Sequence, residues 1–195
     1  MKIRDARAGD WERIWPFWQR IVRAGETYTW DPRTSEPEAR ALWTGPGRRV
    51  FVVTDDVHAT DATDATGGTD GTGGTDATDS AETVVASAYI KANYGGPAAA
   101  VANAGFMVDP AYGGRGYGRA LAEHVLAEAR ADGYRAMVFN AVVETNPAVG
   151  LWSSLGFTVL GTVPDAFDHP RHGRVGLHVM HRALEAGTTG APLSG

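Results

Sequence analysis

Apolar residues along this chain either alternate with other residues or recur at helical spacing, and each pattern predicts one type of element. Val175, Leu177 and Val179 alternate as in a strand, whereas Leu121 and Val125 belong to a run with helical spacing. The order of these elements predicts an α/β protein of the α+β type, with a mixed sheet and helices on both faces. The predicted strands span residues 3–6, 49–54, 83–90, 101–108, 135–142, 157–163 and 173–181, and the predicted helices span residues 10–23, 35–43, 116–132 and 147–155.

Local signals refine the limits of several elements. Asp10 is a residue type that favours the N-cap position, so we expect it to cap the first helix. Pro16 lies inside that helix, where its missing N–H and its ring predict a kink or a break. The helix is followed by an aromatic loop, Gly25 to Trp30, and the sixth strand is followed by a turn, Pro164 to Phe167.

Residues 59–81 form a low-complexity segment between the second and third predicted strands. Threonine recurs at every third position, and the segment has five Asp, no Lys or Arg and no aromatic or large aliphatic residue. It cannot bury enough apolar surface to offset its ordering entropy, so we predict a disordered loop insert. A calcium-binding Asp/Gly repeat is the alternative, but such repeats require an apolar residue in every turn. We therefore expect one domain over residues 1–184, interrupted by this insert and followed by a flexible tail at residues 185–195.

The net charge of the chain is −5, and the five Asp of the insert account for this value. The formal charges of the other residues sum to zero. A balanced chain gives no indication of nucleic-acid binding. No apolar run approaches 18 residues, so no membrane association is expected. The N-terminus lacks the apolar core of a signal peptide, and the absence of cysteine excludes disulfides and thiolate chemistry. A cytoplasmic location is expected.

The densest motif is a glycine-rich loop between a predicted strand and a predicted helix. The strand should end at Asp109-Pro110, because proline lacks a backbone donor and restrains the residue before it. A strand, a glycine loop and a helix N-terminus together predict a phosphate site, since free N–H groups and the helix dipole favour an anion there. The spacing does not match the Gly-x-Gly-x-x-Gly dinucleotide fingerprint, and the Gly-Lys-Ser/Thr of the phosphate loop is absent.

This stretch resembles the acetyl-CoA signature of the GNAT N-acetyltransferases, Gln/Arg-x-x-Gly-x-Gly/Ala after a Val-x-Pro strand end. Val108-Asp109-Pro110 and the run from Gly114 to Leu121 match it, whereas Gly113 stands where Gln or Arg is usual. The resemblance implies a GNAT fold, with a central, mostly antiparallel sheet that contains a splayed parallel strand pair. It also implies acetyl-CoA as cosubstrate, with its pantetheine arm on the strand backbone and its pyrophosphate on the loop amides. The cofactor-binding residues implied in this way are Phe106, Met107, Val108, Gly113, Gly114, Arg115, Gly116, Tyr117, Gly118 and Arg119.

Three asparagines resemble site residues of the GNAT subgroup that contains the yeast N-acetyltransferase of the proline analogue azetidine-2-carboxylate. The resemblance implies that Asn103 and Asn140 are catalytic, orienting the substrate or polarising the carbonyl, and that Asn146 contacts the cofactor. A primary amide suits this chemistry, because its NH2 donates to a carbonyl or oxyanion and its oxygen accepts from an amine. Structural explanations exist as well: Asn140 can satisfy a strand end, and Asn146 can cap a helix that starts at Pro147.

The acceptor pocket is expected to use the aromatic loop and the turn after the sixth strand. The candidate substrate-binding residues are Glu26 and Tyr28 in the loop and Phe167 in the turn. The histidines show no convincing metal-ligand spacing, so no metal site is expected.

The motifs do not identify the general acid that would protonate the thiolate or the general base that would deprotonate the amine. Trp152 stands where many GNAT proteins carry a tyrosine that protonates the leaving thiolate, so the thiolate is expected to leave unassisted or through water. The candidate general bases are Glu26, Glu144, His178 and ordered water.

These features predict a GNAT enzyme that moves an acetyl group from acetyl-CoA to a small-molecule amine, directly within a ternary complex. An amino acid or an analogue is the favoured acceptor. The alternatives are another amine (an aminoglycoside, a polyamine or a protein N-terminus) and a non-catalytic domain that senses acyl-CoA. Few acids lie near the expected pocket, which argues against aminoglycosides and polyamines. A homodimer is a further expectation from the family.

Overall fold

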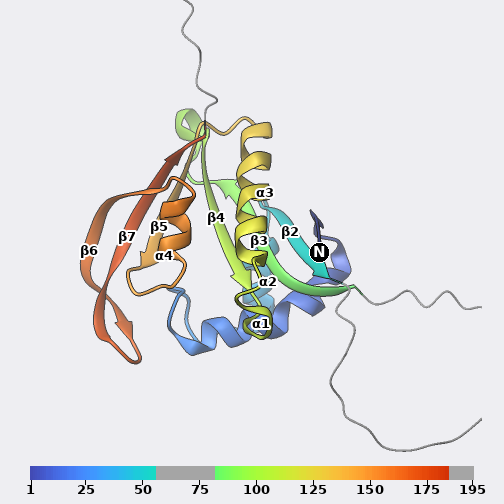
Figure 1. Cartoon of the computed structure of the whole chain (residues 1–195), viewed down its shortest axis with the longest axis horizontal. Coiled ribbons are helices and arrows are strands. Elements are labelled where there is room, and N and C mark those ends of the chain that lie inside the picture. The colour runs from blue at the N-terminus through green and yellow to red at the C-terminus, as the bar shows by residue number, and fades with distance from the viewer. Residues whose placement is uncertain (56–81, 185–195) are drawn as a thin grey trace, which may run out of the picture.

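The computed structural model describes residues 1–55 and 82–184, whose strands form one mixed sheet (Figure 1). The predicted insert at residues 59–81 and the predicted tail at residues 185–195 lie outside the described residues. The strands are β1 (Lys2–Asp5), β2 (Arg49–Asp55), β3 (Thr83–Ala92), β4 (Val101–Val108), β5 (Ala136–Val143), β6 (Thr158–His169) and β7 (Gly173–Ala183). The α-helices are α1 (Trp11–Ala24), α2 (Glu36–Thr44), α3 (Tyr117–Ala131) and α4 (Val149–Ser154).

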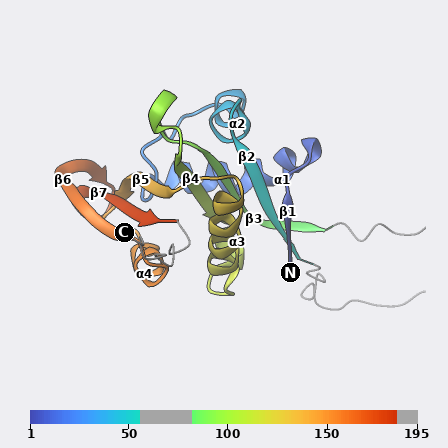
Figure 2. The ribbon, with the colours of Figure 1, turned by 90° about the horizontal axis from the view of Figure 1, so that it is seen from above.

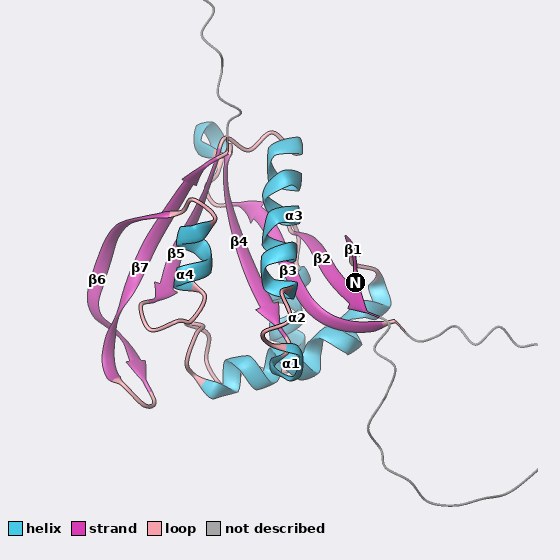
Figure 3. Ribbon diagram, in the orientation of Figure 1, coloured by secondary structure: helices cyan, strands magenta, loops and turns pink. Residues whose placement is uncertain are grey.

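The seven strands lie in the order β1-β2-β3-β4-β5-β7-β6, as the strands in Figure 3 can be followed across the molecule. Every neighbouring pair is antiparallel except β4 and β5. These two strands are parallel because α3 lies between them in the chain and returns it to the same end of the sheet. The predicted mixed sheet with one parallel pair is therefore confirmed.

Helices cover both faces of the sheet, as the view from above shows (Figure 2). On one face, the buried rings of Trp18 and Trp43 from α1 and α2 pack in the same cluster as Val52 of β2. On the other face, Leu121 of α3 and Trp152 of α4 belong to a second cluster. Each helix forms because its apolar stripe is buried in this way. Among residues 1–55 and 82–184, no helix is both long and apolar enough to cross a membrane.

Asp10 lies directly before α1, as predicted, but its side chain does not play the predicted role. Asp10 does not cap α1 through its side chain; its carboxylate accepts from the Arg7 amide at 2.7 Å and from Arg4 Nη1 at 2.6 Å. The predicted cap is wrong because the Asp10 carboxylate accepts hydrogen bonds from the Arg4 guanidinium and from the preceding turn instead of from the helix amides. Pro16 lies within a helix that is continuous from Trp11 to Ala24, so it does not split α1.

The segment predicted as a turn, Pro164 to Phe167, is part of β6 instead. Its pairing with β7 shifts between Val163 and Phe167, and Asp165 has a φ of 51°. Such an irregularity lets a strand continue past residues that would otherwise stop it. Proline and aspartate favour turns locally, but the β7 ladder resumes at Phe167 opposite Val175 and overrides that preference.

The β2–β3 ladder leads to a first prediction, concerning the insert. Asp55 and Thr83 are Cα partners, so the two strands already meet where the segment begins. We expect replacement of residues 59–81 by a four-residue Gly/Asn turn to change the melting temperature by less than about 3 °C, because loop-closure entropy varies slowly with length. Thermal unfolding of both proteins and a turnover assay measure this; a loss of the cooperative transition would show that the segment contributes to the fold.

Candidate functional site

The pairing between β4 and β5 stops early, and the divergence opens a slot in the middle of the sheet. Val101 lies opposite Ala136 and Ala102 opposite Met137, and these two fully described strands form no further pair. The β4 backbone beyond Ala102 therefore has no neighbouring strand on that side. A free strand edge offers rows of N–H and C=O groups that an extended ligand can bind.

Asn103 bridges the two strands at the point where they diverge. Its Nδ2 donates to the Val138 carbonyl oxygen of β5 at 2.8 Å, and the residue is only 9% exposed. The side chain thus satisfies a β5 carbonyl that has no backbone partner on β4. One N–H and the Oδ1 of the Asn103 amide remain for a second partner.

The slot widens into a pocket of about 450 Å³. Its walls come from β4, β5, the loop after α1 and the first turns of α3 and α4, and none of the described residues that line it is charged. The lining includes these residues singled out from the sequence: Tyr28, Asn103, Phe106, Met107, Val108, Gly118, Asn140, Asn146 and Trp152.

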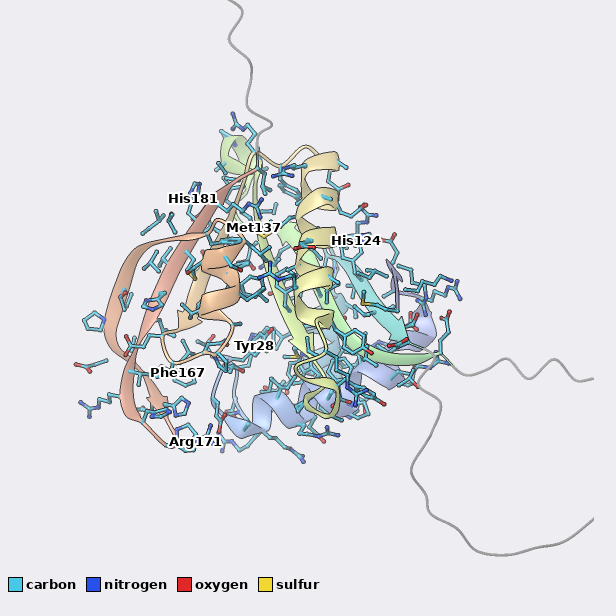
Figure 4. All side chains as sticks on the ribbon, in the orientation of Figure 1. Tyr28, His124, Met137, Phe167, Arg171 and His181 are labelled. Atoms are coloured by element: carbon cyan, nitrogen blue, oxygen red, sulfur yellow. The ribbon has the colours of Figure 1, made fainter. Side chains whose placement is uncertain are left out.

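The Tyr28 side chain, labelled in Figure 4, contacts the free edge of β4. Its hydroxyl donates to the Phe106 carbonyl oxygen at 2.7 Å and accepts from the Phe106 N–H at 3.1 Å. Both backbone groups of Phe106 therefore point into the slot. Because backbone groups of alternate residues point to the same side of a strand, those of Val108 point into the slot and those of Met107 towards β3.

The ring of Tyr28 is held by stacking on Trp30, at 4.7 Å between ring centroids. Burial raises the pKa of the Tyr28 hydroxyl far above its ordinary value, and the nearby Tyr89 adds to this rise. The hydroxyl therefore stays protonated and acts as a neutral donor throughout the physiological pH range.

The glycine loop presents backbone N–H groups at the start of α3. Gly114 and Gly116 have φ values of 75° and 84°, a conformation that favours glycine, and α3 begins directly afterwards at Tyr117. The first amides of a helix have no partner within it, so they are available to an anion. Gly118 lines the pocket, and a Cβ on it would lie 3.5 Å from Cγ2 of Val108.

The long side chains of this loop contact the protein itself. The Tyr117 hydroxyl donates to Asp55 at the end of β2. Arg119 Nη2 donates to the Ser154 hydroxyl at 2.7 Å, which ties α3 to α4. A ligand of this loop would therefore meet mainly backbone groups.

Asn140 and Asn146 both line the pocket, and both carry hydrogen bonds within the protein. Asn140 exchanges two amide hydrogen bonds with Asn93, at 2.7 and 3.1 Å. Asn146 Oδ1 accepts from the Ala148 amide at 2.9 Å, so it stabilises the turn that leads into α4. The predicted cap is wrong, because α4 begins at Val149, two residues later than predicted, and Ala148 occupies its N-cap position without a side-chain bond.

Four residues that the sequence suggested as substrate-binding residues or general bases lie outside the pocket lining. The Glu26 carboxylate pairs with Arg171 at 2.9 Å, and Arg171 and Phe167 both belong to the β6–β7 hairpin (Figure 4). Glu144 and His178 are also absent from the lining. No described lining residue carries a carboxylate or an imidazole, which favours a water route for the proton.

The sequence analysis did not single out the floor of the pocket. Tyr89 of β3 lines it, and a Cβ on Gly105 of β4 would lie 2.5 Å from Cε1 of that ring. The ring therefore lies directly on the glycine backbone. A glycine inside a predicted strand is a general signal of such a close approach, but nothing in the sequence identifies Tyr89 as the partner.

Comparison with known sequences identifies related proteins. The model of the acetyltransferase (GNAT) family matches residues 15–157. N-acetyltransferase aca1 of Schizosaccharomyces pombe is 42% identical over 79 residues, which cover 40% of this chain and 38% of that protein. The match thus spans less than half of the length of this curated relative.

Solved structures share the fold over almost the whole chain. A GCN5-related N-acetyltransferase from Kribbella flavida is 47% identical, with a TM-score of 0.77 and coverage of 93% of this chain and 96% of that chain. A phosphinothricin acetyltransferase from Sinorhizobium meliloti, solved in complex with acetyl-CoA, is 24% identical, with a TM-score of 0.73 and coverage of 100% and 94%. A putative acetyltransferase from Salmonella typhimurium, yncA, solved with acetyl-CoA, is 23% identical, with a TM-score of 0.69 and coverage of 98% of each chain.

Proposed function

Because this chain belongs to the acetyltransferase (GNAT) family, we propose that it transfers an acetyl group from acetyl-CoA to the amine of a free amino acid or a close analogue. The observation that carries the proposal is a pocket of about 450 Å³, open to the free edge of β4, whose lining within residues 1–55 and 82–184 carries no charged side chain. The resemblance of the three asparagines to the subgroup that acetylates a proline analogue supports the same substrate class.

The site residues fit acetyl-CoA in two places. The Phe106 and Val108 backbone groups face the slot, where an extended amide-bearing chain such as pantetheine can pair with them as an added strand does. The amides from Gly114 to Arg119 suit a pyrophosphate, because glycine conformations and a helix N-terminus bring several N–H groups to one anion. Acetyl-CoA supplies the acetyl group as a thioester with a good leaving group.

The pocket disfavours polycationic acceptors. Aminoglycosides and polyamines carry several ammonium groups, and burying them requires carboxylates, which none of the described lining residues supplies. The carboxylate of an amino acid can instead accept from neutral amides. Asn140 lies at the slot on β5, and its Nδ2 keeps one N–H beyond the bond that it donates to Asn93.

Polarisation of the thioester carbonyl is assigned to amide donors in this proposal. The Phe106 N–H and the free N–H of Asn103 both lie at the slot, and preorganised donors of this kind stabilise the oxyanion that develops when the amine attacks. Water takes the ammonium proton before attack, because no described lining residue is a base.

A thiol-release assay tests the proposed acceptor class. The protein is mixed with acetyl-CoA and single amines: proline and its analogues, common amino acids, polyamines and aminoglycosides. The chain has no cysteine, so a thiol reagent reports only released CoA. We expect turnover with amino acids; turnover with polyamines or aminoglycosides alone would overturn the assignment, and acetyl-CoA binding without any turnover would indicate an acyl-CoA sensor.

Tyr28→Phe gives a second prediction with a defined sign. In the free protein this change leaves both slot-facing groups of Phe106 without their protein partner, which should cost about 1 kcal/mol, or roughly 2–4 °C in melting temperature. Acetyl-CoA would then form hydrogen bonds with the Phe106 N–H and C=O without displacing the Tyr28 hydroxyl. The Kd for acetyl-CoA should therefore fall several-fold. Calorimetric titration with acetyl-CoA measures the change.

Tyr94→Phe is the matched control for this prediction. Tyr94 is 50% exposed and does not line the pocket, so the same loss of a hydroxyl should leave the Kd unchanged. Weaker acetyl-CoA binding by Tyr28→Phe would instead show that the Tyr28 hydroxyl itself contacts the cosubstrate.

A further inference from the structure

A second pocket, of about 350 Å³, lies at the β1 edge of the sheet. It shares no lining residue with the slot between β4 and β5, although Tyr89 of β3, which lines the slot, also lies under the Arg48 guanidinium of the second pocket. In Figure 1, β1 and β2 lie on the opposite side of α3 from β5. The second pocket is bordered by the end of β1, the turn into α1, the last turns of α2 and the start of β2.

Four arginines line this pocket, and Asp5 is its only described acidic lining residue. Asp5 is committed to one of the four: its carboxylate accepts from Arg49 Nε at 2.8 Å and Nη2 at 3.1 Å. Arg49 is further paired with Glu128 at 2.6 Å and Asp132 at 3.2 Å. The positive charge of Arg49 is thus fully compensated within the protein.

The other three arginines, Arg7, Arg40 and Arg48, have no carboxylate partner among the described residues. Arg7 and Arg40 are exposed on either side of the pocket, one before α1 and one in α2. Arg48 is half-buried, with its guanidinium 5.6 Å from the Tyr89 ring centroid, and its buried Nε has no hydrogen-bond partner in the described part of the chain. Buried N–H donors are normally satisfied, so this one indicates a missing acceptor.

Three uncompensated guanidiniums around one cavity repel each other, and an anion removes that repulsion. Guanidinium groups match the oxygens of phosphate geometrically and can each donate two hydrogen bonds. Trp11 and Ile14 close the inner side of the pocket, which lowers the local dielectric and strengthens the attraction.

We infer that the pocket formed by Arg7, Arg40 and Arg48 is a binding site for a small phosphate-type oxyanion, distinct from the acetyl-transfer site. The site has the volume for a phosphate monoester or a diphosphate. Arg7 and Arg40 supply donors from the rim, and Arg48 supplies them from the inner wall. This inference rests on the second pocket alone, so it does not depend on the identity of the acceptor amine.

Thermal unfolding of the full chain with inorganic phosphate or pyrophosphate tests the site. Saturating acetyl-CoA is present throughout, so that the phosphate-binding amides of the glycine loop are already occupied. Sodium chloride at matched ionic strength provides the reference for screening. At about ten times its Kd, the anion should raise the melting temperature by roughly 3–6 °C and saturate.

The double variant Arg7→Gln, Arg40→Gln should lower the anion affinity at least about tenfold, because two charged donors are lost. Neither side chain has a described partner, so folding should be unaffected, as the melting temperature in chloride will show. The charge-matched control is Arg33→Gln, Arg174→Gln, which changes two exposed arginines outside the pocket and should keep the wild-type shift. An equal shift in both double variants, or no saturable shift in the wild type, would overturn the inference.

Discussion

Asn103→Ala is expected to lower kcat/KM by about 100-fold. The side chain bridges β4 to β5 through Val138 at the only place where the parallel pair diverges, and it borders the pocket. Without it, the Val138 carbonyl either stays unpaired or draws the β4 backbone towards β5, which narrows the slot. Both outcomes misplace the groups that face the acetyl donor. Steady-state kinetics with the best acceptor from the amine panel measure the effect.

The melting temperature separates these two outcomes. An unpaired carbonyl costs about 1–3 kcal/mol and should lower the melting temperature by roughly 3–9 °C. A closed slot should leave stability nearly unchanged while abolishing acetyl-CoA binding. Lys91→Ala is the control, because Lys91 is the Cα partner of Asn103 on β3 and changes the neighbouring position without touching β5. Full activity of Asn103→Ala would refute a role for this bridge in catalysis.

Gly118→Glu is expected to raise the Kd for acetyl-CoA at least about 100-fold. Gly118 lies in the first turn of α3 and lines the slot, so the new carboxylate would stand beside the amides proposed to hold the pyrophosphate. Like charges about 4 Å apart repel by about 4 kcal/mol at an effective dielectric constant of 20, which exceeds the energy of a 100-fold change. The fold should survive, since an acidic residue in the first helical turn interacts favourably with the helix dipole.

Ala127→Glu is the charge-matched control for that variant. Ala127 is exposed and lies in a later turn of α3, so the same charge there should leave the Kd within about twofold of the wild type. Gly118→Ala adds a second comparison, because its Cβ meets Val108 and Leu151 only at ordinary contact distances. Equal affinities in Gly118→Glu and Ala127→Glu would remove the glycine loop from the proposed cofactor site.

The family and the fold could be predicted from local patterns. The strand that ends at Asp109-Pro110, the glycines at positions 114 and 116 and the helix that follows are contiguous, and each has a direct conformational cause. The same local reasoning failed where a distant partner decides the conformation. Asp10 is taken by Arg4 instead of capping α1, and the segment from Pro164 to Phe167 follows the β7 ladder instead of turning.

In the candidate site too, the sequence indicated the residues, whereas their contacts depend on the tertiary structure. The sequence suggested Asn103 and Asn140 as catalytic residues and Tyr28 as a substrate-binding residue, and the structure brings all three to one pocket. Their roles remain predictions. The sequence could not show that Tyr28 bonds to the backbone of Phe106, nor that Glu26 pairs with Arg171 outside the lining, because these contacts join residues far apart in the chain.

The sequence by itself determined most of the elements and the glycine loop, because these depend on hydrophobic period and on the backbone preferences of glycine and proline within short windows. It indicated the family through the resemblance of one contiguous motif, Val108 to Leu121, to the acetyl-CoA signature. Only the tertiary structure decided where β4 and β5 diverge, which backbone groups face the slot, and that the described residues of the pocket walls are uncharged. Those properties depend on which side chains meet across the sheet. Tertiary packing also gathers Arg7, Arg40 and Arg48, which are separated by up to 41 positions in the sequence (48 − 7), around one cavity.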